Sequence, residues 1–113
     1  MTPMLTAALF GRSHVIKALK RVDISLQGDG GWTAMHFASV DGHVEVIKTL
    51  KELRGDVSSQ DNVRGTPMHI AAEEGHVNAV KTLKELGGNI SAKDEHGLTP
   101  MDVARSEGYI TEQ

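Results

Sequence analysis

The sequence is short of several residue types, and each shortage excludes a class of protein. It has no cysteine among its 113 residues, which excludes disulfides and thiol catalysis and fits a reducing compartment. Aromatic residues make up only 4% of the chain, so a core must be built from Ala, Val, Ile, Leu and Met. No apolar run is long enough to span a membrane, and the N-terminal residues lack the basic head and apolar stretch of a secretory signal. We therefore expect an intracellular, cytoplasmic protein with no membrane partner.

Charge and length set two further limits. The formal net charge is −3 at pH 7, which gives no support to a phosphate-binding surface, so we expect no nucleic-acid partner. A chain of 113 residues has room for one domain, which we place at 1–113.

What the sequence does contain is a tetrapeptide that returns at a fixed interval. It stands at 33–36 (Thr-Ala-Met-His), 66–69 (Thr-Pro-Met-His) and 99–102 (Thr-Pro-Met-Asp), and a related copy at 2–5 precedes the first of these at a slightly shorter interval. A period of about 33 residues is typical of a stacked repeat protein rather than of a globule with one closed core. Each repeat of such a stack touches only its neighbours, and the stack offers one long open surface. This geometry favours binding another macromolecule over enclosing a substrate.

Each unit is predicted to hold two short helices. In the third unit, Thr66 can cap a helix that begins at Pro67, because Thr accepts a backbone N–H and the N–H that Pro lacks would have no partner there. Gly75 ends this helix, since Gly adopts the left-handed conformation without penalty. Residues 77–86 then carry an apolar residue at every third position, which predicts an amphipathic second helix. Residues 89–97 are rich in Asn, Asp, Ser and Gly, which indicates a turn or hairpin.

These motifs resemble the ankyrin repeat. That family opens each unit with Thr-Pro-Leu-His and continues with a small-residue pair, Gly-His, a branched-aliphatic helix and an Asp-containing hairpin tip; here the Leu is Met in all four copies. The resemblance implies an all-α, right-handed ankyrin-repeat solenoid of stacked helix-turn-helix units with β-hairpin or loop fingers. It covers three full repeats and a partial fourth, at 1–27, 28–60, 61–93 and 94–113.

One departure from the family is systematic. Where the family's second helix carries a run of leucines, this chain has Thr49 and Thr82 on one side and Lys51 and Lys84 on the other. The departure predicts a narrower apolar stripe, and with it either a modest stack or an outer face that is more solvated than usual.

The ends of the sequence leave two interpretations open. The chain starts at the first helix of repeat one and stops where the second helix of repeat four should begin, and Asp102 replaces the His of the opening motif, as is frequent in a last repeat of this family. The array either ends naturally here or belongs to a longer protein. We favour the longer protein, because a missing final helix leaves apolar surface uncovered.

Histidines are the most tempting candidates for chemistry, because histidine serves both as general base and as metal ligand. His36 and His69 recur once per repeat, which catalytic residues do not, so we expect them to hydrogen-bond between neighbouring loops and tie the repeats together. The same holds for His43 and His76. Glu73 lies four residues after His69, but a metal site needs three or four ligands and no second His-rich helix completes one. We expect no metal and no cofactor.

Other enzyme motifs are incomplete. Residues 28–31 (Gly-Asp-Gly-Gly) look like a phosphate loop but lack the following Gly-Lys-Ser/Thr, and they fit a hairpin tip. No serine stands in a nucleophile-elbow context, and Glu73 and Glu74 are too close in sequence to flank a substrate. We predict that the chain is not an enzyme.

The resemblance also supplies a candidate binding surface. In the family, hairpin tips and first helices line the concave side on which partners usually dock, and the residues that vary between copies there are candidates for specificity. Trp32 either anchors a partner as a hot spot or packs against the stem of its hairpin. The candidates combine an apolar area towards the N-terminal end with an acidic area, so we predict a partner that presents an apolar anchor and nearby basic residues. The apolar candidates are Leu9, Phe10, Trp32 and Val40, the acidic area is Glu73 and Glu74, and the remaining candidates are Asp29, Asp41, Asn62, Val63, Glu95, His96 and Leu98.

The sequence thus predicts a monomeric, non-catalytic protein–protein interaction module, an adaptor or scaffold, that binds a partner protein through its concave face and hairpin tips. The alternative is a regulatory or targeting ankyrin domain cut from a larger enzyme or effector whose activity lies outside this chain.

Overall fold

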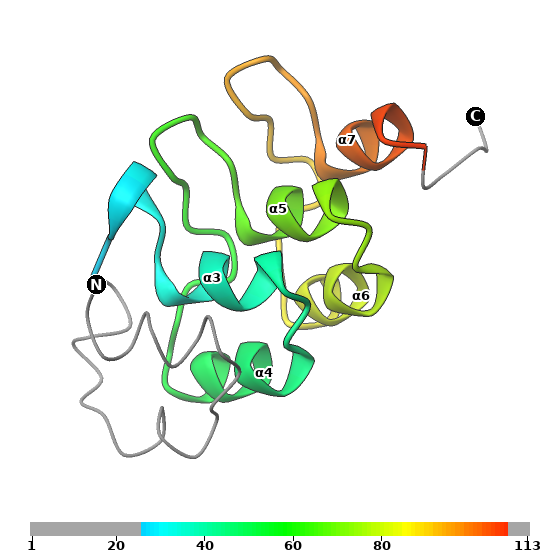
Figure 1. Cartoon of the computed structure of the whole chain (residues 1–113). Coiled ribbons are helices and arrows are strands. Elements are labelled where there is room, and N and C mark those ends of the chain that lie inside the picture. The colour runs from blue at the N-terminus through cyan, green and yellow to red at the C-terminus, as the bar shows by residue number, and fades with distance from the viewer. Residues whose placement is uncertain (1–25, 109–113) are drawn as a thin grey trace.

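The structure, a computed structural model, describes residues 26–108 of the chain (Figure 1). Leu9, Phe10 and nearly all of the first repeat therefore lie outside the described residues. Within 26–108 there are five α-helices and one short 3-10 helix, η2 (Asp29–Gly31). None of the helices in this part of the chain has the length and apolar character that crossing a membrane requires.

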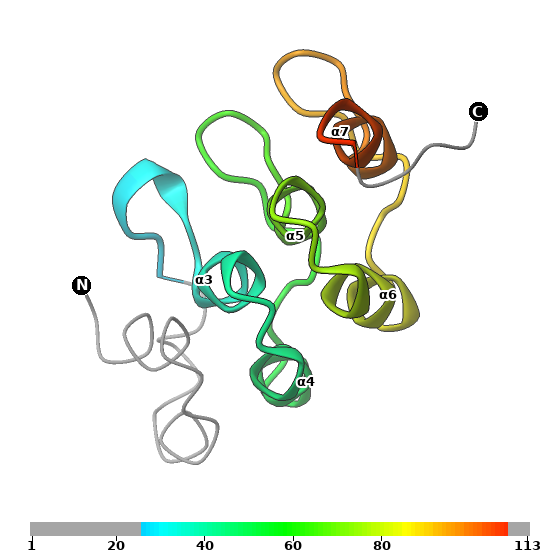
Figure 2. The same cartoon turned by 45° about the vertical axis from the view of Figure 1, so that its right-hand side comes forward.

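The helices form two rows, as the repeat pattern predicts. Figure 2 shows the first helix of each repeat side by side in one row and the second helices in a neighbouring row, with the loops extending away from that second row. Within the first row α5 packs against its neighbours on both sides, and each second helix packs against the first helix of its own repeat. The first row is α3 (Ala34–Val40), α5 (Pro67–Glu73) and α7 (Pro100–Ser106), and the second row is α4 (Val44–Glu52) and α6 (Val77–Glu85).

The predicted helix starts and stops are confirmed. The hydroxyl oxygen of Thr66 accepts the backbone N–H of His69 at 3.3 Å, and that of Thr99 accepts the N–H of Asp102 at 3.2 Å. Each of these helices begins with proline directly after its capping threonine. Gly75 follows α5 with φ +75°, the left-handed conformation that ends a helix.

The core lies between the two rows and is built from aliphatic and small residues, as the composition requires. Its largest members are Ile47, Leu50 and Leu83, each at most 1% exposed. Alanines of α3 and α5 let the rows approach closely.

The two flanks of the second helices differ in exposure. Thr49 and Thr82 are buried, so the threonine flank is not more solvated, whereas Lys51 and Lys84 on the other flank are exposed. The Thr49 hydroxyl donates to the carbonyl of Glu45 at 2.9 Å, which removes the cost of burying it.

The β-hairpin fingers are not confirmed, since within residues 26–108 the segments before α3, α5 and α7 contain no strand. An aspartate side chain takes the backbone N–H groups that a strand ladder would use. One oxygen of Asp61 accepts the N–H groups of Val63 and Gly65 at 2.9 and 2.7 Å, and Asp94 accepts those of His96 and Leu98 at 2.9 and 3.0 Å. These are Asx turns, which replace a hairpin turn locally.

The loop of the third repeat holds one residue in a strained backbone conformation that a substitution can relieve. Arg64 has φ +62°, while the equivalent residues of the adjacent repeats are glycines, Gly31 at φ +79° and Gly97 at φ +75°. A residue with a Cβ pays about 1–2 kcal/mol in this left-handed conformation. Glycine avoids that cost, but it also gives the unfolded chain more conformational entropy, which offsets about 0.4–1 kcal/mol of the gain. We expect Arg64→Gly to raise the free energy of unfolding by about 0.5–1 kcal/mol in urea titrations followed by circular dichroism.

The reverse change provides the control for that prediction. A Cβ added at Gly97 would meet nothing within 4 Å, so Gly97→Ala tests the backbone conformation alone. It should lower the free energy of unfolding by a similar amount. Equal stabilities for Arg64→Gly and the parent chain would show that this loop stores no backbone strain.

Candidate functional site

Buried histidines connect α3 and α5 to the loop of the following repeat. The Nδ1 atom of His36 lies 3.2 Å from the backbone N of Thr33, and its Nε2 atom lies 2.8 Å from the carbonyl oxygen of Gly65, 29 residues away. Because a backbone N–H can only donate and a carbonyl can only accept, these partners assign the neutral tautomer with its proton on Nε2. The prediction that this histidine ties neighbouring loops together is confirmed.

The same connection recurs in the third repeat and changes in the fourth. His69 Nε2 lies 2.7 Å from the carbonyl oxygen of Leu98, while His76 Nε2 lies 3.0 Å from that of Val40, so the Gly-His motif also joins two repeats. Asp102 accepts the N–H of Thr99 at 3.0 Å and thus preserves the local cap. This contact with the Thr99 backbone holds the pKa of the Asp102 carboxyl below its usual value.

Burial makes His36 sensitive to acid. Burial lowers the pKa of His36 below its usual 6.5, against the opposing effects of the Gly65 carbonyl and of the Asp61 and Asp56 carboxylates. As the pH falls below 6.5, the unfolded chain takes up a proton that the folded chain binds only at lower pH. The stability contributed by neutral His36 is therefore fully present above pH 6.5 and is lost as the pH falls through the lower, folded-state pKa.

The pH dependence of stability tests this linkage. Between pH 7 and pH 5 the parent chain should lose free energy of unfolding with a slope of up to about 1.4 kcal/mol per pH unit from this residue. His36→Gln removes the titrating group, so its stability should change less over the same range. The measurement is urea unfolding of both proteins at pH 7, 6 and 5. Parallel pH profiles would contradict the assignment of the effect to His36.

The loop tips that the sequence singles out lie next to one another. The backbone N–H of Asn62 donates to the carbonyl of Gly30 at 2.9 Å, and that of Glu95 donates to the carbonyl of Val63 at the same distance. These two bonds bring the three tips into one continuous row. Five predicted residues of this row are exposed, namely Asp29, Asn62, Val63, Glu95 and His96, and Leu98 is half-buried.

The other predicted residues lie at the opposite end of the first helices. Val40 and Asp41 end α3, and Glu73 and Glu74 end α5. A helix of seven residues is about 10 Å long, so α3 separates Val40 from Trp32 by roughly that distance. Val40 thus stands at the far end of α3 from Trp32, and Glu73 and Glu74 stand at the far end of α5 from the tips.

An apolar series that the sequence reasoning missed lies between these two groups. Phe37, Ile70 and Val103 recur at the repeat interval, directly after the fourth residue of each opening motif, and all three are half-buried. Trp32 meets Phe37 edge-on with ring centroids 5.1 Å apart and stacks on His36 at 5.9 Å. The sequence contains this pattern, because the residue that follows the opening motif is apolar in three successive copies. We call Phe37, Ile70 and Val103 the apolar series.

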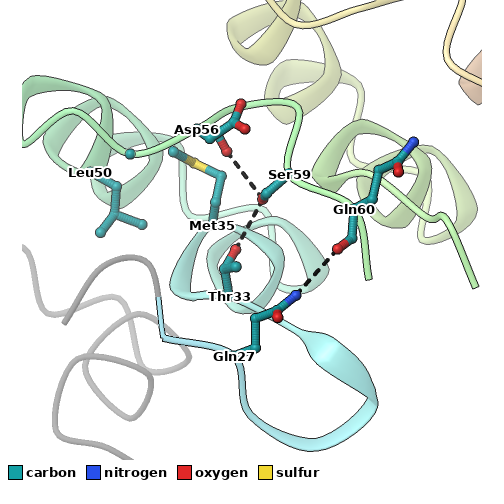
Figure 3. Close-up of a pocket in the computed structure, with 8 residues that line it drawn as sticks. Gln27, Thr33, Met35, Leu50, Asp56, Ser59 and Gln60 are labelled. Atoms are coloured by element: carbon teal, nitrogen blue, oxygen red, sulfur yellow. Dashed lines mark hydrogen bonds between the residues drawn. The ribbon is translucent and has the colours of Figure 1, made fainter. Parts of the chain in front are cut away.

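A hollow of about 300 Å³ lies between the loop before α3 and the segment after α4 (Figure 3). The Thr33 and Ser59 hydroxyls lie 3.2 Å apart within it, and Ser59 donates to the backbone carbonyl of Asp56 at 3.2 Å. Gln27 reaches across to the carbonyl of Gln60 at 3.4 Å. The Thr33 hydroxyl also lies 3.0 Å from His36 Nδ1, the nitrogen that accepts the Thr33 backbone N–H in the helix cap. These contacts join two repeats.

The acidic and histidine side chains do not gather into a ligand set elsewhere in the described part of the chain. Among residues 26–108 no three such side chains lie close enough together to hold a metal ion. Every buried side-chain nitrogen or oxygen there also has a hydrogen-bond partner. The polar groups of the interior are thus engaged in holding the stack.

Comparisons with known proteins agree with this arrangement. A family model described as ankyrin repeats in three copies matches residues 1–61, and one described as ankyrin repeats in many copies matches residues 52–104. No curated protein matches the chain.

Proposed function

Because the chain belongs to the ankyrin-repeat family, we propose that it is a non-catalytic module that binds a partner protein through its loop tips and first helices. Ankyrin repeats are in general protein–protein interaction modules and are typically non-catalytic. The observation that carries the proposal is the difference in burial between two sets of residues within the repeats. The opening motifs at 33–36 and 66–69 are buried and hold the stack, while most of the residues that differ between repeats at the tips and helix ends are exposed.

The proposed binding surface has three parallel parts. The row of tips forms one edge, the apolar series lies next to it, and the C-terminal ends of the first helices form the other edge. At that second edge Asp41, Glu74 and Glu107 are all exposed and recur at the repeat interval, so one carboxylate stands at the same place on α3, α5 and α7. Neighbouring helices pack about 8–10 Å apart, which sets the spacing of this acidic row.

This arrangement supports a partner of particular chemistry. A row of carboxylates at the helix ends favours a partner with basic side chains. Electrostatic attraction of this kind raises the association rate of the two proteins more than it raises their affinity. Trp32 and Phe37 offer an aromatic contact for an apolar anchor, although Trp32 also packs on its own helix. We propose a protein segment with an apolar anchor between basic residues. A monomeric state and a cytoplasmic location stay predictions.

The alternative, a regulatory or targeting module of a larger enzyme or effector, gains no support from the described residues and is not proposed.

Charge reversal at the helix ends tests the proposal. The chain and a Glu73→Lys/Glu74→Lys variant would be used as bait in a lysate of the organism that makes the protein, with quantitative mass spectrometry as readout. The control is Glu52→Lys/Glu85→Lys, which makes the same change of charge at exposed residues of α4 and α6. We expect a specific partner to be captured at least tenfold less by the first variant, or about 1.4 kcal/mol, and equally by the control. A partner lost with the control and kept by the helix-end variant would place the site on the second helices.

A further inference from the structure

Arg64, in the loop before α5, holds a backbone conformation that favours glycine. Its φ is +62°, and the equivalent residues of the loops before α3 and α7 are Gly31 and Gly97. The Arg64 side chain is exposed, and within residues 26–108 it takes part in no ion pair and no hydrogen bond. A strained residue whose side chain makes no contact that stabilises the fold is a candidate for function.

A second arginine with positive φ shows what a structural reason looks like. Arg54 has φ +68° and directly follows Leu53, the residue that caps the C-terminal end of α4. The backbone N–H of Arg54 donates to the carbonyl of Lys51 at 2.9 Å. Positive charge is favourable at the C-terminal end of a helix. Arg64 follows no helix, so this explanation does not apply to it.

Arg64 also differs in charge from the rest of the three loop tips, which we define as residues 28–31, 61–64 and 94–97. It is their one lysine or arginine, and their acidic residues are Asp29, Asp61, Asp94 and Glu95. The Glu95 carboxylate lies 3.8 Å from the Nε2 atom of His96 and does not pair with Arg64. The loop of Arg64 lies between the other two loops (Figure 2). A positive charge therefore stands at the centre of an otherwise acidic row.

This distribution of charge favours an acidic side chain of the partner at the central tip. A guanidinium group is a planar set of donors that binds a carboxylate through two parallel hydrogen bonds. The carboxylates of Asp29 and Glu95 would repel an acidic residue placed at either outer tip. They also disfavour a phosphate group, which carries more negative charge than a carboxylate. The row thus accepts an acidic residue at the central tip only.

We propose that Arg64 binds one aspartate or glutamate of the partner segment and thereby fixes the position of that segment along the three repeats. The inference rests on the proposed function, because it concerns the same loop tips, and it adds an acidic residue to the apolar anchor and the basic residues of the partner. Arginine is enriched among the residues that dominate binding at interfaces. The strained backbone at Arg64 is then a loss of stability that accompanies binding, as is common at functional positions.

A peptide selection tests the inference with a defined probe. Random peptides displayed on phage would be selected separately on the parent chain and on Arg64→Gly. Peptides selected on the parent should share an acidic residue at a fixed distance from an apolar residue, and peptides selected on Arg64→Gly should lack it. Because we expect Arg64→Gly to be more stable than the parent, unfolding would not account for a loss of binding.

Binding of one parent-selected peptide, labelled with fluorescein, locates the contact. Fluorescence anisotropy should show at least tenfold weaker binding to Arg64→Gly. Replacing the acidic residue of the peptide by its amide should cause the same loss, and the two changes together should cause no further loss. Arg64→Glu should bind the original peptide poorly and bind a version with arginine in place of the acidic residue at least tenfold better.

Arg54→Gly is the matched control, because it makes the same changes of charge and backbone at an exposed residue outside the tips. It should bind the selected peptide as the parent does. The Glu73→Lys/Glu74→Lys variant tests the proposed function with the same peptide and should weaken its binding. Loss in that variant with normal binding to Arg64→Gly would refute the role of Arg64 alone, whereas normal binding to the helix-end variant would count against the helix ends.

Three results would overturn the inference. The first is a set of parent-selected peptides that share no acidic residue. The second is equal binding of the selected peptide to the parent and to Arg64→Gly. The third is equal loss of binding in Arg64→Gly and Arg54→Gly, because the effect would then come from the net charge of the chain and not from a contact at the central tip.

Discussion

Replacing His36 with alanine should lower the free energy of unfolding by about 3 kcal/mol. The change removes the bonds to the Thr33 N–H and the Gly65 carbonyl, both of which lie in buried residues. The Gly65 carbonyl keeps the N–H of Asp61 as a partner, but the Thr33 N–H is left with none. An unsatisfied buried polar group costs about 1–3 kcal/mol, and the lost ring stacking with Trp32 adds about 0.5–1.5 kcal/mol.

The measurement is urea unfolding at pH 7.5, where the imidazole is neutral in both folded and unfolded states. His96→Ala is the matched control, because the His96 side chain is 75% exposed at a loop tip and its loss should cost at most about 0.5 kcal/mol. If the two substitutions destabilise the chain equally, the histidine connection between repeats does not stabilise the stack.

Replacing Leu83 with alanine should cost about 2–5 kcal/mol, because it leaves a cavity between α4, α5 and α6. Leu83 has no exposed surface and belongs to the core shared by the second and third repeats. In a stack whose repeats contact mainly their neighbours, damage to one interface weakens the coupling across it. The unfolding transition should therefore become broader as well as shift to lower urea.

Val77→Ala in the same helix provides the comparison for that cavity. Val77 is 55% exposed, so its truncation removes few packing contacts and should cost less than about 1 kcal/mol. Similar losses for Leu83→Ala and Val77→Ala, measured by circular dichroism in urea, would show that the interface between α4 and α6 contributes little to stability.

The helices could be predicted from the sequence because their boundaries are encoded locally. A capping threonine precedes Pro67 and Pro100, and Gly75 follows α5, so the start and end of these helices depend on a few neighbouring residues. The role of His36 was predictable for a different reason. A histidine that recurs once per repeat favours a structural role between repeats over catalysis, and the Gly65 carbonyl of the next repeat is the partner of His36.

The loops were harder to predict because two structures compete for the same backbone groups. A run rich in Asn, Asp, Ser and Gly fits a hairpin, yet the Asp61 and Asp94 carboxylates take the N–H groups that would pair the strands. The burial of Thr49 was also missed. Composition alone does not reveal that its hydroxyl can be satisfied by the carbonyl of Glu45 within the same helix.

The sequence predicted which residues belong to the candidate surface, but it did not predict how those residues are arranged in space. Variation between repeats identified the tips and the helix ends, but it did not reveal that α3 separates Trp32 from Val40. It also missed the apolar series, because those residues are similar in the second, third and fourth repeats and the reasoning favoured positions that differ. A comparison of residue character at each repeat position would have found both the apolar series and Glu107.

Site-specific cross-linking tests the central claim most directly. A photoreactive benzoylphenylalanine would replace Val63, an exposed residue of the central loop tip, in one protein and Lys48, an exposed residue of α4, in another. Both would be irradiated with a partner captured by the parent chain. We predict a cross-linked product from position 63 and none from position 48. A product from position 48 alone would contradict binding through the loop tips and first helices.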